Sequence, residues 1–345
     1  MKFLLVLLCV VSLAVPAEAL QLEPPALPPE RADRMPDSTD SLWDGLWELL
    51  SKAVGALHPD LREAARVSVG ILSAAVMVSV LQSFSSPVKT AAQAAGAVTV
   101  AATLLLSANS MIRLAADTVG EIGEYGTLLL PVMTAALAAQ GGVTSSAALY
   151  AGTALFNSFL GSLLSQLLVP GIYLFLALSA GGCATGEAFL DKTAQLLKGF
   201  LSWMLKTLLM VFTTYLGLTG VVSGTTDAAA LKAARVTMSS FIPVVGGILS
   251  DASEAVLVSA GLMKNAAGIY GILAVLALFL QPFLRIAVHY LMLKLTAAVC
   301  AMFTGQGMTG IIESFCTAMG LLLGMTGAAC IMVLISTVCF MKGVG

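Results

Sequence analysis

The stretch AMGLLLGMTGAACIMVLISTVCF, Ala318–Phe340, decides the fold class of this chain. It contains no charged side chain from end to end. A helix of about 20 residues, rising about 1.5 Å per residue, crosses a hydrocarbon layer about 30 Å thick. A membrane β-strand would instead alternate apolar and polar residues over about ten positions. The stretch therefore predicts a membrane-spanning α-helix, and Gly199–Val222, interrupted only by Lys206, predicts another.

The composition extends this prediction to the whole chain. Of its 345 residues 58% are hydrophobic and only 10% are charged, whereas a soluble domain has about 25% charged residues. We therefore expect an all-α, polytopic transmembrane helical bundle with about 8–10 membrane segments. The net charge of −2 offers no basic face to nucleic acid. The sequence contains no nucleotide-binding P-loop, nucleophile elbow or zinc-protease motif, so we expect no enzyme activity and no cofactor.

Three regions follow one another along the chain. Residues 1–19 combine a basic start, an apolar run and a small-x-small cleavage site, and predict a signal peptide. An uncleaved anchor is the alternative, but the apolar run is short for a span. Residues 20–65 predict an extracytoplasmic disordered linker and then an amphipathic helix, in which Trp43 and Trp47 suit a membrane interface. Residues 66–345 predict the polytopic membrane domain.

Proline spacing suggests an internal repeat. Pro131 and Pro170 have the same separation in the chain as Pro243 and Pro282, so the second pair repeats the first at a fixed offset. The offset predicts two weakly similar halves, 91–185 and 203–305. Because proline removes a helix hydrogen bond, we expect interrupted helices at Pro131 and Pro243. Chance agreement in an apolar sequence is the alternative.

Topology depends on these interrupted segments. If both cross the membrane, the halves are parallel, and if both re-enter, the halves are inverted. Crossing is favoured because it places three lysines in the cytoplasm: Lys89, Lys192 and Lys198. Between the segments 91–112 and 127–139, the charged residues of 113–124 predict a solvated connector with an ion pair between residues four apart.

One apolar stretch is unusually polar: Arg235–Ile272, RVTMSSFIPVVGGILSDASEAVLVSAGLMKNAAGIYGI. A charge at the bilayer centre costs about 2.5 kcal/mol or more. Its charged residues therefore either lie on an interfacial helix that faces water, or face a polar cavity or a protein partner. The candidate functional polar and hinge positions are Pro131, Pro243, Asp251, Glu254, Lys264 and Asn265.

Two glycine pairs with small-x3-small spacing, Gly220/Gly224 and Gly320/Gly324, allow close approach of helices in lipid. They predict tight helix packing or self-association.

The polar stretch closely resembles the matching stretch of the stage III sporulation protein AE family. The shared pattern here is Phe241-Ile242-Pro243-Val244, then Asp251-Ala252, then Leu262–Gly268 with Lys264 and Asn265. A second match is Leu130-Pro131 followed by Gly141-Gly142.

The resemblance implies a multi-pass component of a channel or secretion-like complex linking mother cell and forespore, required for forespore development after engulfment. It further implies residence in the mother-cell membrane around the forespore, beside other membrane subunits of the stage III complex and a separate ATPase subunit. A stand-alone secondary transporter for a small solute is the alternative, since an internal repeat and a charged broken segment are compatible with it. A scaffold without a pore is a third hypothesis.

Overall fold

A computed structural model describes residues 24–37, 41–81, 86–185, 187–241, 246–302, 304 and 306–342. Every regular element in these ranges is helical, which confirms the all-α prediction. The elements are η2 (Pro29–Arg34), α2 (Leu42–Gly55), α3 (Leu57–Leu81), α4 (Ser86–Ala139), α5 (Val143–Leu163), the π-helical turn η3 (Leu164–Leu168), α6 (Val169–Thr185), α7 (Ala188–Phe241), α8 (Gly246–Cys300) and α9 (Gln306–Lys342).

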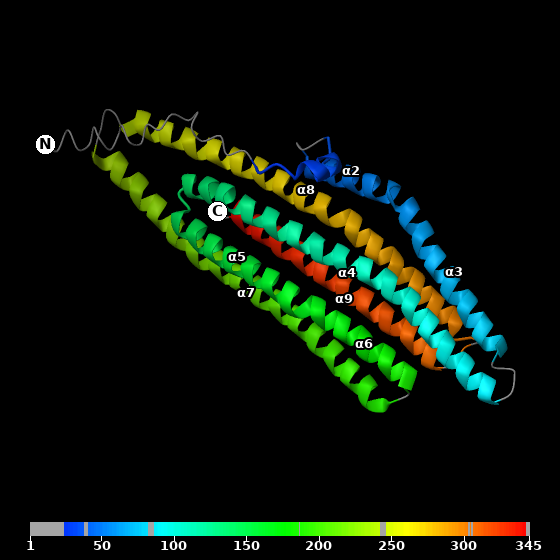
Figure 1. Ribbon diagram of the computed structural model, residues 1–345. Helices are drawn as coiled ribbons and strands as arrows, with labels where there is room; N and C mark the ends of the chain where they lie inside the picture. The colour runs from blue at the N-terminus through cyan, green and yellow to red at the C-terminus, as the bar shows by residue number, and fades with distance from the viewer. Residues whose placement is uncertain are drawn as a thin grey trace.

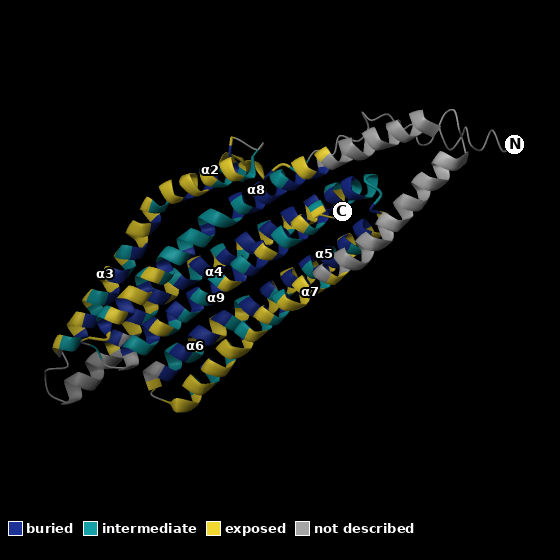
Figure 2. Cartoon of the chain, turned by 180° about the vertical axis from the view of Figure 1, so that it is seen from behind, coloured by how far each residue is buried: buried dark blue, intermediate teal, exposed yellow. Residues whose placement is uncertain are grey.

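The long helices run antiparallel in one elongated bundle (Figure 1). We call the end where α4 turns into α5 the first end, and the end where α6 turns into α7 the second end. Helix α9 lies at the centre and packs against α4, α5, α6, α7 and α8. Helix α3 covers α4 and α8 from outside, and α2 packs on α8. Buried residues face the interior along α4, α8 and α9 (Figure 2).

Within the described ranges, six helical segments are long and apolar enough to cross a membrane, rather than the 8–10 predicted. Segments expected to be separate are joined: 91–112 with 127–139 in α4, 149–169 with 170–180 in α5–α6, and 266–284 with 286–303 in α8. The prediction took prolines and charges as helix ends. In a membrane bundle, neighbouring helices and local adjustments can accommodate a proline.

The expected interruption at Pro131 is wrong, because α4 continues through it. Helix α8 likewise continues through Pro282. At Pro170 the chain widens into η3, where the Val169 N–H donates to the Leu164 carbonyl. Pro243 lies outside the described residues. The repeat remains a prediction. The separation in sequence between Ser86, where α4 begins, and Ala188, where α7 begins, is smaller than the separation between Pro131 and Pro243 that defines the repeat.

The helices are longer than a bilayer is thick. Helices α4 and α7 each have 54 residues and α8 has 55. At about 1.5 Å per residue these measure about 80 Å, against a hydrocarbon core of about 30 Å. Part of the bundle therefore lies outside any single membrane.

The turn between α4 and α5 shows why the chain reverses there. The Gly141 N–H donates to Ala138 O at 2.9 Å, and the Gly142 N–H donates to Leu137 O at 3.1 Å. This is the Schellman arrangement, which places a left-handed residue just after the helix. Gly141 has φ 90°, as that position requires.

Replacing Gly141 with alanine should lower the free energy of unfolding by about 1 kcal/mol, because a Cβ is strained in the left-handed region. Denaturant titration of the purified protein in detergent measures the change. Gly70→Ala is the matched control, since a Cβ at Gly70 in α3 meets nothing within 4 Å. Equal effects of the two substitutions would contradict the assigned turn.

Candidate functional site

Charged side chains gather about half-way along the bundle into a polar belt, which we define as Arg31, Asp60, Glu63, Glu121 and Arg285. Arg31 forms an ion pair with Glu121 of α4. Arg285 of α8 places Nε 3.2 Å from Asp60 Oδ1, and its Nη2 donates to Glu63 Oε2 at 2.8 Å. The belt therefore connects the N-terminal segment and α3 to the two long helices α4 and α8.

The structure around the belt differs from two predictions, one for residues 113–124 and one for residues 20–40. The connector 113–124 is not a break between spans but the middle of α4. Glu121 pairs with Arg31, 90 residues away, rather than with a residue of its own helix. The linker of 20–40 was expected to be disordered, yet its described part includes η2 and the buried Leu27. Apolar contacts and the ion pair hold this segment on the bundle.

Helix α2 lies beside the belt as a surface helix. Trp43 and Trp47 are 76% and 72% exposed, as expected for an amphipathic helix at a membrane interface. Lys52 Nζ lies 2.7 Å from Glu48 Oε1 and donates to the Met35 carbonyl at 3.1 Å. The hydrogen bond to Glu48 raises the pKa of Lys52. Burial lowers the pKa of Arg34, in the segment that α2 helps to hold.

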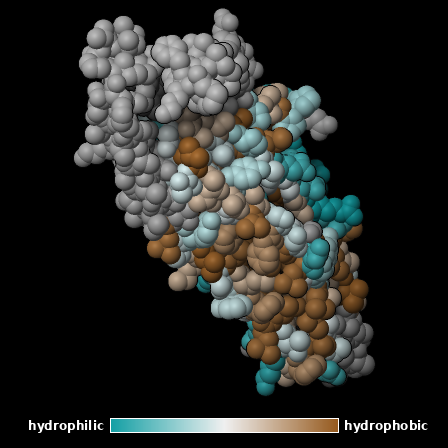
Figure 3. All heavy atoms as spheres, turned by 90° about the vertical axis from the view of Figure 1, so that its left-hand side faces the viewer, coloured by the Kyte–Doolittle hydropathy of each residue, from teal (hydrophilic) through white to brown (hydrophobic). Residues whose placement is uncertain are grey.

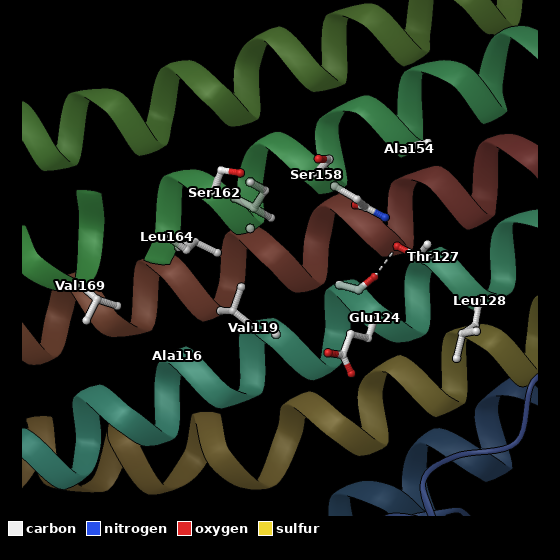
Figure 4. Close-up of a pocket in the computed structure, with 15 residues that line it drawn as sticks. Ala116, Val119, Glu124, Thr127, Leu128, Ala154, Ser158, Ser162, Leu164 and Val169 are labelled. Carbon is white, nitrogen blue, oxygen red and sulfur yellow. Dashed lines mark hydrogen bonds between the residues drawn. The ribbon is translucent and has the colours of Figure 1, made fainter. Parts of the chain in front are cut away.

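A groove of about 830 Å³ lies between α4 and α5 at the level of the belt (Figure 4). Its walls carry small side chains: Ala116, Gly120 and Gly123 on α4, and Ala154, Ser158, Gly161 and Ser162 on α5. Several of these are exposed, so the groove opens at the protein surface. Its shape suits an elongated apolar object such as a helix.

Two polar side chains of this groove stand out. Glu124 lies at its rim on α4 and is exposed (Figure 4). Asn157 lines the groove from α5 and is only 9% exposed. Neither Nδ2 nor Oδ1 of Asn157 finds a hydrogen-bond partner among the residues that the structure describes. A buried polar group without a partner costs about 1–3 kcal/mol, so the groove is energetically incomplete as it stands.

Of the predicted site residues, Pro131, Lys264 and Asn265 have described side chains, so a site formed by all six remains a prediction. Pro131 is exposed on α4. Asp251 and Glu254 lie on the backbone of α8, and their side chains, like Pro243, are outside the described residues. Lys264 is only 5% exposed, whereas Asn265 beside it is exposed.

A physical reason for the buried Lys264 lies in its neighbours. It is one turn from Gly268, where a Cβ would meet the Met341 side chain in the last turn of α9. The C-terminal end of a helix carries partial negative charge, which favours a cation nearby. This supports a structural role for Lys264 at the first end of the bundle.

Sequence reasoning missed the groove, although its signal is present. Ala116-x3-Gly120 and Ala154-x3-Ser158-x3-Ser162 have the small-x3-small spacing. The pair Gly320/Gly324, which has the same spacing, faces inward instead: Cβ atoms there would approach Tyr290 and Leu205 of the same chain. Side chains at Gly220 and Gly224 are outside the described residues. Within the described ranges, no cluster of three His, Cys, Asp or Glu residues could hold a metal.

Comparison with known proteins identifies the family. A family model described as stage III sporulation protein AE matches residues 38–343. The chain belongs to the stage III sporulation protein AE family. This confirms the resemblance found in the sequence. The family is one of sporulation membrane proteins rather than of enzymes, and its assignment implies a role in stage III of sporulation. With six candidate spans among its described helices, the chain is a multi-pass membrane protein.

One curated relative in this family is the stage III sporulation protein AE of Bacillus subtilis (strain 168), 28% identical over 171 residues. The match covers 50% of this chain and 43% of the relative, so it spans less than half of that protein. No solved structure matches the chain.

Proposed function

We propose that this protein is a multi-pass component of the membrane complex of stage III sporulation, a channel or secretion-like assembly that links mother cell and forespore. The observation that carries the proposal is the family match over residues 38–343, which includes nearly the whole bundle. In this role the protein acts with other membrane subunits and a separate ATPase subunit in the mother-cell membrane around the forespore. Forespore development after engulfment depends on it.

The polar belt supports a specific placement in the membrane. From Glu63 in the belt, α3 continues to Leu81 near the second end. That part of the helix covers about 27 Å, close to one hydrocarbon thickness. In Figure 3 an apolar surface lies below the hydrophilic residues at the right edge and above scattered ones at the bottom. In this proposal the part of the bundle level with Glu63–Leu81 of α3 lies in the bilayer, and the start of α4 extends beyond it.

The predicted signal peptide supports the orientation. It would place the N-terminal segment and α2, which lie on the side of the belt away from the second end, outside the cytoplasm. The second end is then the cytoplasmic end, where Lys192 and Lys198 lie on α7 and Lys294 on α8. The half towards the first end then projects from the opposite side of the membrane, with apolar side chains exposed, including Leu128, Leu155 and Phe159. Such a projection suits contact with other proteins of an assembly.

The alternative of a stand-alone transporter has less support. It depended on interrupted helices in two related halves, and α4 is continuous through Pro131. Transport by the purified chain in vesicles, without other subunits, would favour it over the complex.

Asp251→Ala combined with Glu254→Ala tests the proposal, because acidic groups on the projecting part of α8 would contact other subunits. In a strain that carries only the variant, sporulation should stall after engulfment, and heat-resistant spores should fall to the level of a deletion strain. The protein should still be found in the membrane fraction. Asp44→Ala, an exposed acid on α2, is the control and should sporulate normally. Normal spore yield from the double variant, or from the deletion strain itself, would contradict this role.

A further inference from the structure

The groove between α4 and α5 has the form of a helix-binding surface. Small residues on both walls let another helix approach closely, and such surfaces drive association within membranes. The groove also carries the exposed carboxylate of Glu124 at its rim, which an apolar helix would leave without a counter-charge. Its occupant should therefore supply a cation.

The outer face of α7 has this chemistry. Lys206 is exposed within a candidate membrane span. Exposed threonines follow it: Thr213 and Thr214 donate to their own backbone carbonyls at 2.8 Å, so each hydroxyl can still accept a hydrogen bond. Large apolar side chains form a ridge along the same helix: Leu196, Phe200, Trp203 and Met210.

Contacts within the chain place Lys206 at the height of the groove. Below it on α7, towards the second end, Leu201 lies against Gly171 of α6. Above it, the Phe212 ring packs on Phe156 of α5, with centroids 5.0 Å apart. The segment bracketed by these two contacts, 156–171, contains the part of the groove wall that runs from Asn157 to Val169.

Glu124 lies at nearly the same height. A Cβ at Gly126 of α4 would lie 3.2 Å from Asn157 Nδ2, so this part of α4 is level with Phe212. On the parallel helices α7 and α4, Lys206 precedes Phe212 by six residues and Glu124 precedes Gly126 by two. The difference of four residues corresponds to about 6 Å along the bundle axis. An extended lysine side chain can bridge such a distance.

We infer that the groove between α4 and α5 receives the outer face of α7 from a second copy of this chain. When two copies are related by a rotation axis along the membrane normal, equivalent residues lie at the same depth in the membrane. Lys206 of one copy therefore meets Glu124 of the next. Because the two surfaces differ, the contact is head-to-tail, which generates a ring or an open array rather than a closed dimer. This inference goes beyond the sporulation role and does not depend on it.

Disulfide cross-linking of the full chain in native membranes tests the arrangement. A chain carrying both Glu124→Cys and Lys206→Cys should give a ladder of covalent oligomers on mild oxidation. Either substitution alone should give only the background of the unsubstituted protein, in which Cys300, Cys316 and Cys330 are buried. The two single variants produced together should give dimers and nothing larger. The pair Met77→Cys with Lys206→Cys, which uses an exposed position on α3, should not cross-link.

Exchanging the two charges gives a second test, and a folding defect cannot produce its expected result. Glu124→Lys or Lys206→Glu alone should lower the association constant about tenfold, a typical size for a polar contact between membrane helices, and the combined exchange should restore it. Glu313→Lys, an exposed acid on α9, should change nothing. No ladder from the cysteine pair, a covalent dimer from Glu124→Cys alone above the background of the unsubstituted protein, or cross-links only to a different protein would each overturn the inference.

Discussion

Replacing Arg285 with methionine should lower the free energy of unfolding by about 2 kcal/mol, since breaking this partly buried ion pair leaves the buried Asp60 carboxylate without compensation. Arg285 is the described cation that contacts both Asp60 and Glu63. Asp60 is only 8% exposed and cannot turn fully to water, whereas Glu63 is half-exposed and can. Methionine preserves much of the apolar stem, so the loss reports on charge rather than on packing.

Denaturant titration in detergent measures this loss, and two further variants separate its causes. Arg285→Met combined with Asp60→Asn should recover most of the stability, because the uncompensated carboxylate is removed. Arg113→Met, which replaces an exposed arginine on α4, should change the free energy of unfolding by less than about 0.5 kcal/mol. If Arg285→Met is as mild as this control, the polar belt does not hold α3 against α8.

The fold class followed from sequence because uncharged stretches such as Ala318–Phe340 admit few structures in lipid. The number of segments did not follow. Pro131 and Pro282 are tolerated inside helices, and whether a proline ends a helix depends on its neighbours rather than on local sequence. The charged residues of 113–124 were wrongly predicted to form a connector between two spans for a similar reason. Glu121 forms its ion pair with Arg31, which is distant in the chain, and no local pattern indicates that contact.

The candidate site, like the fold, could be predicted only in part from the sequence. Sequence located the unusual polarity of Arg235–Ile272, and the family match confirmed the resemblance that this stretch carries. The groove depends on two helices that meet side by side, and the spacing of Ala116 and Gly120 alone cannot say which helix faces them. The burial of Asn157 is likewise a property of packing, because its neighbour Gly126 belongs to a different helix and is distant in the chain.

Replacing Gly96 with alanine should lower the free energy of unfolding by about 2 kcal/mol, the usual cost of overpacking. A Cβ at Gly96 of α4 would lie 2.1 Å from Val78 Cγ2 of α3 and 3.1 Å from Met308 Cε of α9. Methionine can bend away, but a β-branched valine in a helix is held near one rotamer. Val78 is also buried, so α3 itself must move away from α4.

A double-mutant cycle with Val78→Ala identifies this contact as the cause. Removing the valine methyl groups leaves room for the new Cβ, so the double variant should be more stable than the sum of the single effects predicts, by about 1 kcal/mol or more. Gly199→Ala on α7, where a Cβ meets nothing within 4 Å, is the control for a glycine replaced inside a long helix. Its free energy of unfolding should be unchanged or slightly raised, because alanine favours a helix over glycine. Additive effects of Gly96→Ala and Val78→Ala would mean that α3 and α4 do not meet at these residues, and the close packing of α3 on the bundle would have to be abandoned.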